Sequence, residues 1–401
     1  MGRRGGVSGP HIAIAGGGIG GLAAALGLAR AGFRVTVLEQ AEAQAEAGAG
    51  LQLAPNASRI LGRLGVLDLL GARAVEPQAL LIRATRGGVL ASLPLGAAAR
   101  QRWGAPFLVA HRADLQAALA AAIAREPAVV LALGSALTGF ASEASGVQIG
   151  FRRGLLRLTM QADALIGADG LHSLVRAKLE TAAAAVVSTR SAWRALAPAA
   201  DAPAFARAAR THLWLGRDAH LVHYPVRGGA LVNVVAIVAE RGGAGEARGF
   251  WDAAGVFPAA RFVRWHEDAR ALLECAPGWR RWPLFERPPL PQWSAGRVAL
   301  LGDAAHPMLP FLAQGAGQAI EDAAALARAL AGGGGTAPAL ASYGAGRSAR
   351  AALVQAASRR QGDIYHLGGP AALARDFALR VMGPERMAAR MDWLYGHDAG
   401  A

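Results

Sequence analysis

Cysteine, lysine and aromatic residues are all scarce in this chain of 401 residues. Cys275 is the only cysteine, which excludes an internal disulfide, a dithiol redox pair and a cysteine-rich zinc site. Lys178 is the only lysine, so the formal net charge of +14 comes almost entirely from arginine. The arginines are scattered and no RNA- or DNA-binding signature accompanies them, so we predict no nucleic-acid partner. We also predict no metal site and, because thiols are so few, a cytoplasmic protein.

Long hydrophobic runs are missing as well. No apolar stretch of about 18 residues is free of dense glycine or charge, so we predict no integral membrane association. The chain starts with MGRRGGVSGP, and the apolar run that follows contains a glycine pattern and ends in a charged segment, unlike a signal peptide. A chain of this length can bury a core without disulfides and has room for two domains.

A strand, a glycine loop, a helix and a second strand follow one another near the N-terminus. The apolar patterns predict strands over His11–Ala15 and Arg34–Leu38, with a helix over Leu22–Ala31 between them. The loop before the helix reads GGGIGG, and an acidic residue follows the second strand. This order is typical of a Rossmann-like α/β unit that binds a dinucleotide.

Each residue of this fingerprint has a geometric role. Gly16 permits the tight turn, Gly18 lets a pyrophosphate approach the backbone, and Gly21 lets the helix pack close to the strand. Glu39 would then accept hydrogen bonds from an adenosine ribose. The pattern predicts dinucleotide binding and leaves open whether the dinucleotide is NAD or FAD.

Two further strand-to-helix junctions carry aspartate beside glycine. Asp169-Gly170 follows one short buried strand, and Gly302-Asp303 follows another, before a helix that begins near Gln314. A helix N-terminus offers unpaired N–H groups and a partial positive charge, which suits an anionic atom of a ligand. An NAD site needs no such junctions, so the pattern favours a long ligand that is held at several places.

Strand-like runs and tryptophans are concentrated between residues 188 and 285. The patterns predict an antiparallel sheet with strands over Thr211–Trp214, His220–Pro225 and Leu231–Val238. A hairpin over Leu80–Leu95 is expected to leave the nucleotide domain and join this sheet. Six tryptophans, together with arginines, are candidates to line a pocket for a planar substrate: Trp193, Trp214, Trp251, Trp265, Trp279 and Trp282. Elsewhere we expect a helix over Ala57–Leu70 and one exposed strand over Gln148–Leu158, with alternating polarity.

Taken in order, the glycine fingerprint, the Asp169-Gly170 pair and Gly302-Asp303 resemble the motifs of the single-component flavoprotein aromatic hydroxylases. The likeness runs from about His11 to Trp393. It is most specific to the group of salicylate hydroxylase, 3-hydroxybenzoate 6-hydroxylase and 6-hydroxynicotinate 3-monooxygenase. The resemblance implies tightly bound FAD, with NADH or NADPH as a transient co-substrate. It also implies that O2 adds to reduced flavin as a C4a-hydroperoxide, which hydroxylates a phenolic or hydroxy-heteroaromatic acid.

On this resemblance, the fold is an α/β Rossmann-like FAD-binding domain with an interleaved mixed or antiparallel substrate sheet and a C-terminal helical segment. The FAD-binding domain is expected to come from three stretches of the chain, residues 1–79, 103–187 and 286–335. The substrate domain is expected to consist of a hairpin over residues 80–102 and a longer stretch over 188–285. Residues 336–401 are expected to form the C-terminal helical segment.

The resemblance also assigns cofactor contacts. Asp303 is expected on the flavin ribityl chain, Arg112 on the flavin, and Asp169 near the pyrophosphate and the path of the pyridine nucleotide. The start of the last helix, at Gly315 and Ala316, is expected beneath flavin N1 and C2=O. Reduced flavin carries negative charge there, which a helix N-terminus stabilises.

A ring substrate of this kind needs a base, and the best candidate is His220. Strand alternation puts His220, Val222 and Tyr224 on one face and His223 on the other. An imidazole can take a phenol proton near neutral pH, and Tyr224 can hydrogen-bond the ring substituents. In the resembling hydroxylases a histidine four residues before Tyr-Pro has this role. We expect His223, and also His306, to be structural.

Two positions depart from the resembling pattern, and other classes stay open. Pro310 stands where some 3-hydroxybenzoate hydroxylases carry glutamine, which leaves room for a salicylate-type decarboxylating reaction. Gln40, a further cofactor-binding candidate, stands where arginine often follows the ribose-binding acid. The alternatives are a flavin oxidase, a disulfide reductase, against which the single Cys275 argues, and a non-catalytic flavin-binding sensor of aromatic acids. The expected partners are an aromatic acid and O2, with a homodimer as a possible assembly.

Overall fold

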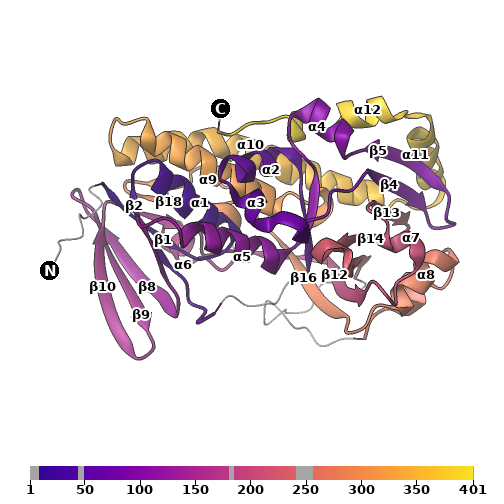
Figure 1. Cartoon of the computed structure of the whole chain (residues 1–401), viewed down its shortest axis with the longest axis horizontal. Coiled ribbons are helices and arrows are strands. Elements are labelled where there is room, and N and C mark those ends of the chain that lie inside the picture. The colour runs from indigo at the N-terminus through magenta and orange to yellow at the C-terminus, as the bar shows by residue number, and fades with distance from the viewer. Residues whose placement is uncertain (1–8, 44–48, 180–184, 241–255, 401) are drawn as a thin grey trace.

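The computed structural model describes residues 9–43, 49–179, 185–240 and 256–400. Within these residues, two large β-sheets, two small sheets and a set of helices form a mixed α/β fold, as the sequence predicts. Figure 1 shows a three-stranded sheet at one end of the molecule and the C-terminal helices α11 and α12 at the other.

The first large sheet has six strands in the order β17-β18-β11-β1-β2-β7. Its strands are β1 (His11–Ala15), β2 (Arg34–Leu38), β7 (Val129–Ala132), β11 (Ala164–Gly167), β17 (Ser294–Ala295) and β18 (Val298–Leu300). All neighbours pair in parallel except β17 with β18. The central strand β1 is apolar after its first residue, as expected where helices cover both faces. Helix α1 (Ile19–Arg30) follows the glycine loop and packs against α5 (Arg112–Ile123) and α9 (Gly315–Ala331).

The second large sheet has seven strands in the order β16-β12-β15-β14-β13-β4-β5. They are β4 (Ala79–Ala84), β5 (Val89–Pro94), β12 (Val186–Pro198), β13 (Thr211–Gly216), β14 (Ala219–Val226), β15 (Leu231–Ala239) and β16 (Arg280–Glu286). The β4–β5 hairpin joins this sheet through β13, so the hairpin does leave the nucleotide-binding region. The β4–β13 pair is parallel, which makes the sheet mixed. Helices α7 (Ala204–Arg207) and α8 (Glu267–Glu274) lie between its strands in sequence.

Two expectations about local structure are wrong. The segment expected as one strand over Gln148–Leu158 is instead β9 (Val147–Arg153) and β10 (Leu156–Ala162), which turn at Gly154 and form a three-stranded sheet with β8 (Ser135–Ser142). The helix expected over Ala57–Leu70 is two helices, α2 (Pro55–Arg63) and α3 (Val66–Leu70), because Gly65 adopts a left-handed conformation with φ 58°. In both places a single glycine ends an element whose apolar pattern continues.

The remaining elements complete the frame. Strands β3 (Gly50–Leu53) and β6 (Leu108–His111) form a two-stranded sheet, and the other helices are α4 (Ala97–Trp103), α6 (Leu174–Leu179), α10 (Thr336–Tyr365), α11 (Gly369–Val381), α12 (Pro384–Ala389) and α13 (Asp392–Tyr395). Among the described residues, no helix is long and apolar enough to cross a membrane, and no cluster of His, Cys, Asp and Glu could hold a metal ion.

A network of buried ion pairs joins α10 to α9. Arg347 on α10 pairs with Glu321 at 2.6 Å and with Asp322 at 2.7 Å, and Arg350 pairs with Glu321 at 2.6 Å. Asp322 also lies 2.6 Å from His306 of the preceding loop. Both carboxylates are fully buried, so each depends on these partners for its charge. The network therefore holds together the start of α9, the loop before it and α10.

We expect Arg347→Met to lower the free energy of unfolding by about 3–5 kcal/mol, because it leaves two buried carboxylates short of a partner. Urea denaturation at neutral pH measures this loss. The matched control is Arg359→Met on the same helix, whose ion pair with Glu286 is half exposed and should cost less than about 1 kcal/mol. Equal losses in the two variants would contradict the assignment.

The same network makes stability dependent on acid. Burial alone would raise the pKa of Asp322, but the neighbouring His306 and Arg347 lower it from 3.8 to about 2. A carboxyl with a lowered folded pKa stabilises the fold fully above its unfolded pKa. That contribution is lost as the pH falls from about 4 towards 2. The acid dependence in this range should be weaker in Arg347→Met.

Candidate active site

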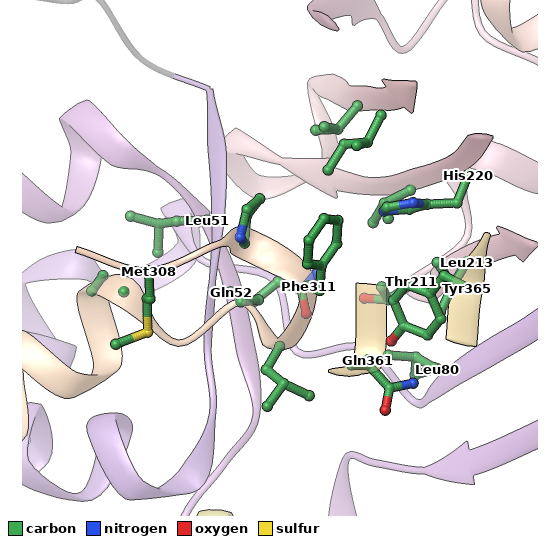
Figure 2. A pocket seen from close by; sticks show the side chains of 18 of the residues that line it. Leu51, Gln52, Leu80, Thr211, Leu213, His220, Met308, Phe311, Gln361 and Tyr365 are labelled. Atoms are coloured by element: carbon green, nitrogen blue, oxygen red, sulfur yellow. The ribbon is translucent and has the colours of Figure 1, made fainter. Parts of the chain in front are cut away.

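One cavity of about 820 Å³ is lined by the second large sheet, by loops that follow strands of the first, by the start of α9 and by the C-terminal helices. Figure 2 shows a portion of its wall, with His220, Phe311 and Tyr365 around the same space. Most of the predicted site residues line this central cavity: Gly18, Gly21, Arg112, His220, Tyr224, Asp303, Gly315 and Ala316. Four do not line it: Gly16 and Glu39, which belong to the glycine loop and its acidic partner, Asp169, which lies between the lining residues Ala168 and Gly170, and Gln40, which follows Glu39.

The three fingerprint glycines differ in what surrounds them. Gly16 has φ +106°, and a Cβ there would lie 2.3 Å from the carbonyl oxygen of Ala168. A Cβ on Gly21 would lie 2.0 Å from the carbonyl oxygen of Gly16, so the helix packs directly on the turn. Gly18 has no atom within 4 Å of its Cβ position and faces the central cavity. Gly16 and Gly21 thus shape the turn and the packing of the helix on it, and Gly18 leaves room for a ligand, as the fingerprint predicts.

The acidic residue after β2 closes the glycine loop. Glu39 accepts hydrogen bonds from the backbone N–H of Gly17 at 2.6 Å and of Ala41 at 2.8 Å. Its carboxylate is therefore held beside the turn and remains partly exposed. Gln40 is exposed beside it. The ribose contacts of both residues stay predictions.

Asp169 is engaged within its own turn. Its carboxylate accepts hydrogen bonds from the Ser173 hydroxyl at 2.5 Å and from the Val175 N–H at 3.1 Å, at the start of α6. Burial raises the pKa of this carboxyl, although these hydrogen bonds oppose the shift. Its neighbours Ala168 and Gly170 line the central cavity, so Asp169 shapes the wall there. A direct contact of Asp169 with a nucleotide stays a prediction.

The stretch from Gly302 to Ala316 combines an unpaired acid with a helix start. Asp303 is exposed towards the central cavity, and its carboxylate makes no hydrogen bond to any described residue. Helix α9 begins at Gly315 without a side-chain cap, which leaves its first N–H groups unpaired on the cavity wall. Just before it, Ala313 has φ 52°, a strained conformation for a residue with a side chain. This loop can bind both hydroxyl groups and an anionic atom of one ligand.

Three arginines line the central cavity without an ion pair to any described carboxylate: Arg112 at the start of α5, Arg194 on β12 and the exposed Arg390 directly after α12. The Nε atom of Arg194 is buried and makes no hydrogen bond among the described residues. Its guanidinium lies 4.9 Å from the ring centre of Trp282, and burial lowers its pKa. A desolvated cation in this setting is suited to bind an anionic ligand. Sequence reasoning pointed to arginine in general and missed Arg194.

The strand β14 places His220, Val222 and Tyr224 on the cavity wall, as alternation predicts. His220 is 1% exposed, and its Nδ1 lies 2.8 Å from Nε2 of His366. This contact leaves Nε2 of His220 for a ligand. Burial and the nearby His366 lower the pKa of His220 well below its ordinary value, so the ring is neutral at physiological pH. Burial raises the pKa of Tyr224, which stays a hydrogen-bond donor.

His223 points to the opposite face of the sheet, also as predicted. It stacks on His212 with ring centres 4.4 Å apart and contacts the ring of Phe205 at 5.4 Å. His306 is bound to Asp322 and stacks on Trp293 at 5.0 Å, which agrees with a structural role in its loop.

The prediction that tryptophans line the pocket is wrong for the described residues. No tryptophan among them is on the wall of the central cavity. Trp193, Trp214 and Trp265 belong to a second hydrophobic core with helix α8, and Trp279 packs against it, while Trp282 stacks under Arg194. The strand registers place Trp193 and Trp214 on the face of the sheet opposite His220, whereas Trp282 is on the same face as His220 and packs near Phe311. Trp251 lies outside the described residues.

Several polar residues line the central cavity although no motif or pattern in the sequence predicts them there. Thr211 is fully buried, its hydroxyl has no hydrogen-bond partner among the described residues, and it lines the central cavity. Gln361 and Tyr365 come from the last turn of α10, and burial raises the pKa of Tyr365 to about 12. Phe311 contributes a ring 5.6 Å from His220. An unmatched buried hydroxyl on a cavity wall indicates a polar ligand.

The fold and the cavity together define a flavoprotein. FAD is a long dinucleotide with a pyrophosphate, a ribityl chain and a ring that becomes anionic on reduction. The residues present fit it: open space above Gly18 for the pyrophosphate, an unpaired Asp303 for ribityl hydroxyls, and the bare N-terminus of α9 for the ring.

Comparison with known proteins gives the same answer. The profile of a family described as FAD binding domain matches residues 10–358. The 3-hydroxybenzoate 6-hydroxylase of Polaromonas naphthalenivorans (strain CJ2) is 37% identical, over 97% of this chain and 96% of its own. The 6-hydroxynicotinate 3-monooxygenase of Bordetella bronchiseptica is 37% identical, over 80% of this chain and 82% of its own. A solved salicylate hydroxylase in a substrate complex has a TM-score of 0.78 at 29% identity, covering 98% of this chain and 97% of that one.

The chain therefore belongs to the FAD-binding family of aromatic-ring monooxygenases, which use NADH or NADPH as co-substrate. The resemblance inferred from the three motifs is confirmed at this level, as are the fold class and the cofactor.

Proposed function

We propose that this enzyme hydroxylates an aromatic acid that carries a ring hydroxyl, with His220 as the base and Arg194 as the carboxylate ligand. The observation that carries the proposal is that a neutral imidazole and an unpaired, desolvated guanidinium line one cavity. A base and a fixed cation are what a phenolic acid requires for binding and activation. The names of the similar enzymes, which mention 3-hydroxybenzoate and 6-hydroxynicotinate, support the same substrate class.

The roles of the protein groups follow from their chemistry. Nε2 of His220 accepts the phenol proton, which raises the electron density of the ring. Tyr224 and Thr211 offer hydrogen bonds that orient it, and Phe311 contributes an apolar wall that excludes water. Arg112, Asp303 and the start of α9 would hold FAD, which supplies the activated oxygen when it is bound and reduced. The carboxylate contact with Arg194 would determine which carbon of the electron-rich ring is presented to that oxygen.

A screen with the FAD-loaded enzyme tests the proposal. NADH or NADPH oxidation and O2 uptake are measured with 3-hydroxybenzoate, salicylate and 6-hydroxynicotinate, and with benzoate as a control without a ring hydroxyl. We expect at least one hydroxylated acid, and not benzoate, to stimulate both and to gain one oxygen atom. Loss of CO2 in the product would identify a salicylate-type reaction. Stimulation without any hydroxylated product, across the panel, would contradict the proposal.

We expect Arg194→Met to weaken the binding of the acid by about 30-fold, the equivalent of about 2 kcal/mol for a charged hydrogen bond. Equilibrium titration with 3-hydroxybenzoate measures the loss, and titration with phenol is the control ligand because it has no carboxylate. Phenol affinity should change little. The control variant is Arg359→Met, which is outside the cavity. An equal loss for both ligands would assign Arg194 to packing or to the flavin instead.

A further inference from the structure

Two buried histidines from distant regions of the chain share one hydrogen bond. His220 is on β14, and His366 follows the last residue of α10, 146 residues later. Nδ1 of His220 and Nε2 of His366 are 2.8 Å apart, and the ring centres are 5.0 Å apart. His366 is the only hydrogen-bond partner of the His220 side chain among the described residues. The sequence pattern points to the first ring and not to the second.

The pair has an inner end and an outer end. His220 lines the central cavity and is 1% exposed, whereas His366 does not line it and is 7% exposed. The charged groups that act on the outer ring come from other elements and are Arg190, Asp218, Arg261 and Asp363. Asp218 and Asp363 are 51% and 62% exposed, so they reach solvent. Nδ1 of His366 is buried and has no hydrogen-bond partner among the described residues, so it is an unsatisfied polar atom at the outer end of the pair. The two rings thus lead from the cavity wall towards the exposed carboxylates of Asp218 and Asp363.

The other groups around His220 do not offer this connection. Phe311 and Tyr365 flank its ring with centres 5.6 Å and 5.2 Å away. The phenylalanine carries no proton, and the tyrosine holds its own because burial raises its pKa to about 12. The loop that approaches from the other side, Pro310–Leu312, has only apolar side chains. A proton that arrives on His220 therefore has His366 as its exit.

We propose that His366 is a positioning and relay residue, which takes the Nδ1 proton of His220 as Nε2 of His220 receives the phenol proton of the substrate. This inference rests on the proposed function. The phenol O–H bond breaks and an N–H bond forms at Nε2 of His220. The Nδ1–H bond of His220 breaks as an N–H bond forms at Nε2 of His366, and Nδ1 of His366, itself buried, gives its proton to a solvent water that enters from the side of Asp218 and Asp363. The net result is a bound phenolate, two neutral rings and one proton in water.

Both rings are neutral because their pKa values are lowered, so neither of them keeps an extra proton. Burial is the main reason that the pKa of His366 falls to about 4, with Arg190 adding to the shift and Asp218 and Asp363 opposing it. The pKa of His220 is lowered by burial and by His366 itself. A cation is therefore unfavourable on either ring, and the proton moves on. In the tautomer that the relay requires, Nδ1 of His220 donates to Nε2 of His366, which leaves Nε2 of His220 unprotonated and ready to accept.

A ligand whose phenolate is coloured distinguishes a proton-relay role of His366 from a packing role, because its ionisation can be followed separately from its binding. The probe is 3-hydroxy-4-nitrobenzoate, a phenolic acid that turns yellow on ionisation, mixed with the FAD-loaded full-length enzyme without NADH. Stopped-flow absorbance measures the rate of ionisation in the complex, and equilibrium titration measures affinity. His366→Gln keeps a side chain that can hydrogen-bond Nδ1 of His220 but cannot pass a proton. His366→Ala removes the ring, and added imidazole can replace it.

We expect ionisation to slow by roughly tenfold or more in both variants, with the affinity for the probe within about threefold of the wild type because His366 does not touch the ligand. Imidazole should restore the rate of the alanine variant. His223→Gln, a buried histidine on the opposite face, is the matched control and should ionise the probe at the wild-type rate. A wild-type rate in His366→Gln, or the same slowing in His223→Gln, overturns the relay alone. Failure of the wild-type enzyme to bind the probe as phenolate overturns the proposed function as well.

Discussion

Replacement of His220 by alanine is expected to lower the rate of product formation by roughly 10²- to 10⁴-fold, the usual contribution of a general base. NADH oxidation should continue, because the residues proposed to hold the flavin, Gly18, Asp303 and the start of α9, are untouched. Oxygen that is reduced but not transferred should leave as hydrogen peroxide. The measurement is the ratio of hydroxylated product to NADH consumed, with peroxide determined in parallel.

The control for this result is His223→Ala on the same strand. Its side chain stacks on His212 behind the sheet, so it should affect stability and leave the coupling ratio intact. An unchanged product ratio in His220→Ala would remove His220 as the base. A loss of NADH oxidation in step with product would instead place His220 in reductive or flavin-binding steps.

The second large effect is expected from Gly18→Val, which should abolish tight FAD binding. In the protein alone a Cβ at this position meets no atom within 4 Å, so the fold should tolerate the side chain. The same space faces the cavity where the dinucleotide fingerprint predicts the pyrophosphate, and valine would fill it. Circular dichroism should be unchanged while flavin absorbance of the purified protein is lost. We expect FAD affinity to fall at least about 100-fold, or about 2.7 kcal/mol.

Gly88→Val is the matched control, because its Cβ position is also open but lies in the β4–β5 hairpin, away from the cavity. This variant should purify with a full complement of FAD. If Gly18→Val also keeps its flavin, the pyrophosphate does not approach this turn. Loss of folding in Gly18→Val would show that the space above Gly18 is needed by the protein itself.

The cofactor side of the protein is largely readable from sequence because its signals are local. Gly16, Gly18 and Gly21 lie within six residues, and the turn geometry they require is the geometry observed. The alternation in β14 likewise predicts which side chains face the cavity, since neighbouring residues on a strand point to opposite sides. These inferences depend only on residues close in sequence.

The substrate side is less readable because its contacts are distant. His220 and His366 are 146 residues apart, and no periodicity links them. Arg194 is identifiable only by the absence of a partner, which depends on what folds against it. The tryptophans were misplaced because composition indicates where aromatic residues are concentrated and not which face of the sheet they occupy. The split of the predicted helix at Gly65 was also missed, because the left-handed backbone of Gly65 ends the helix although the apolar pattern continues.

The C-terminal helices give the molecule a modular character. The family match ends at residue 358, whereas Gln361, Tyr365 and the residues of α11 that line the cavity come later in the chain. One part of the cavity wall is therefore encoded after the stretch that the family profile covers, whereas His220, Tyr224 and Arg194 are encoded within it. Exchange of the segment after residue 358 between relatives should change the shape of the cavity beside the ring while His220, Arg194 and the predicted flavin contacts are kept, which offers a route to adjusting the specificity of this fold.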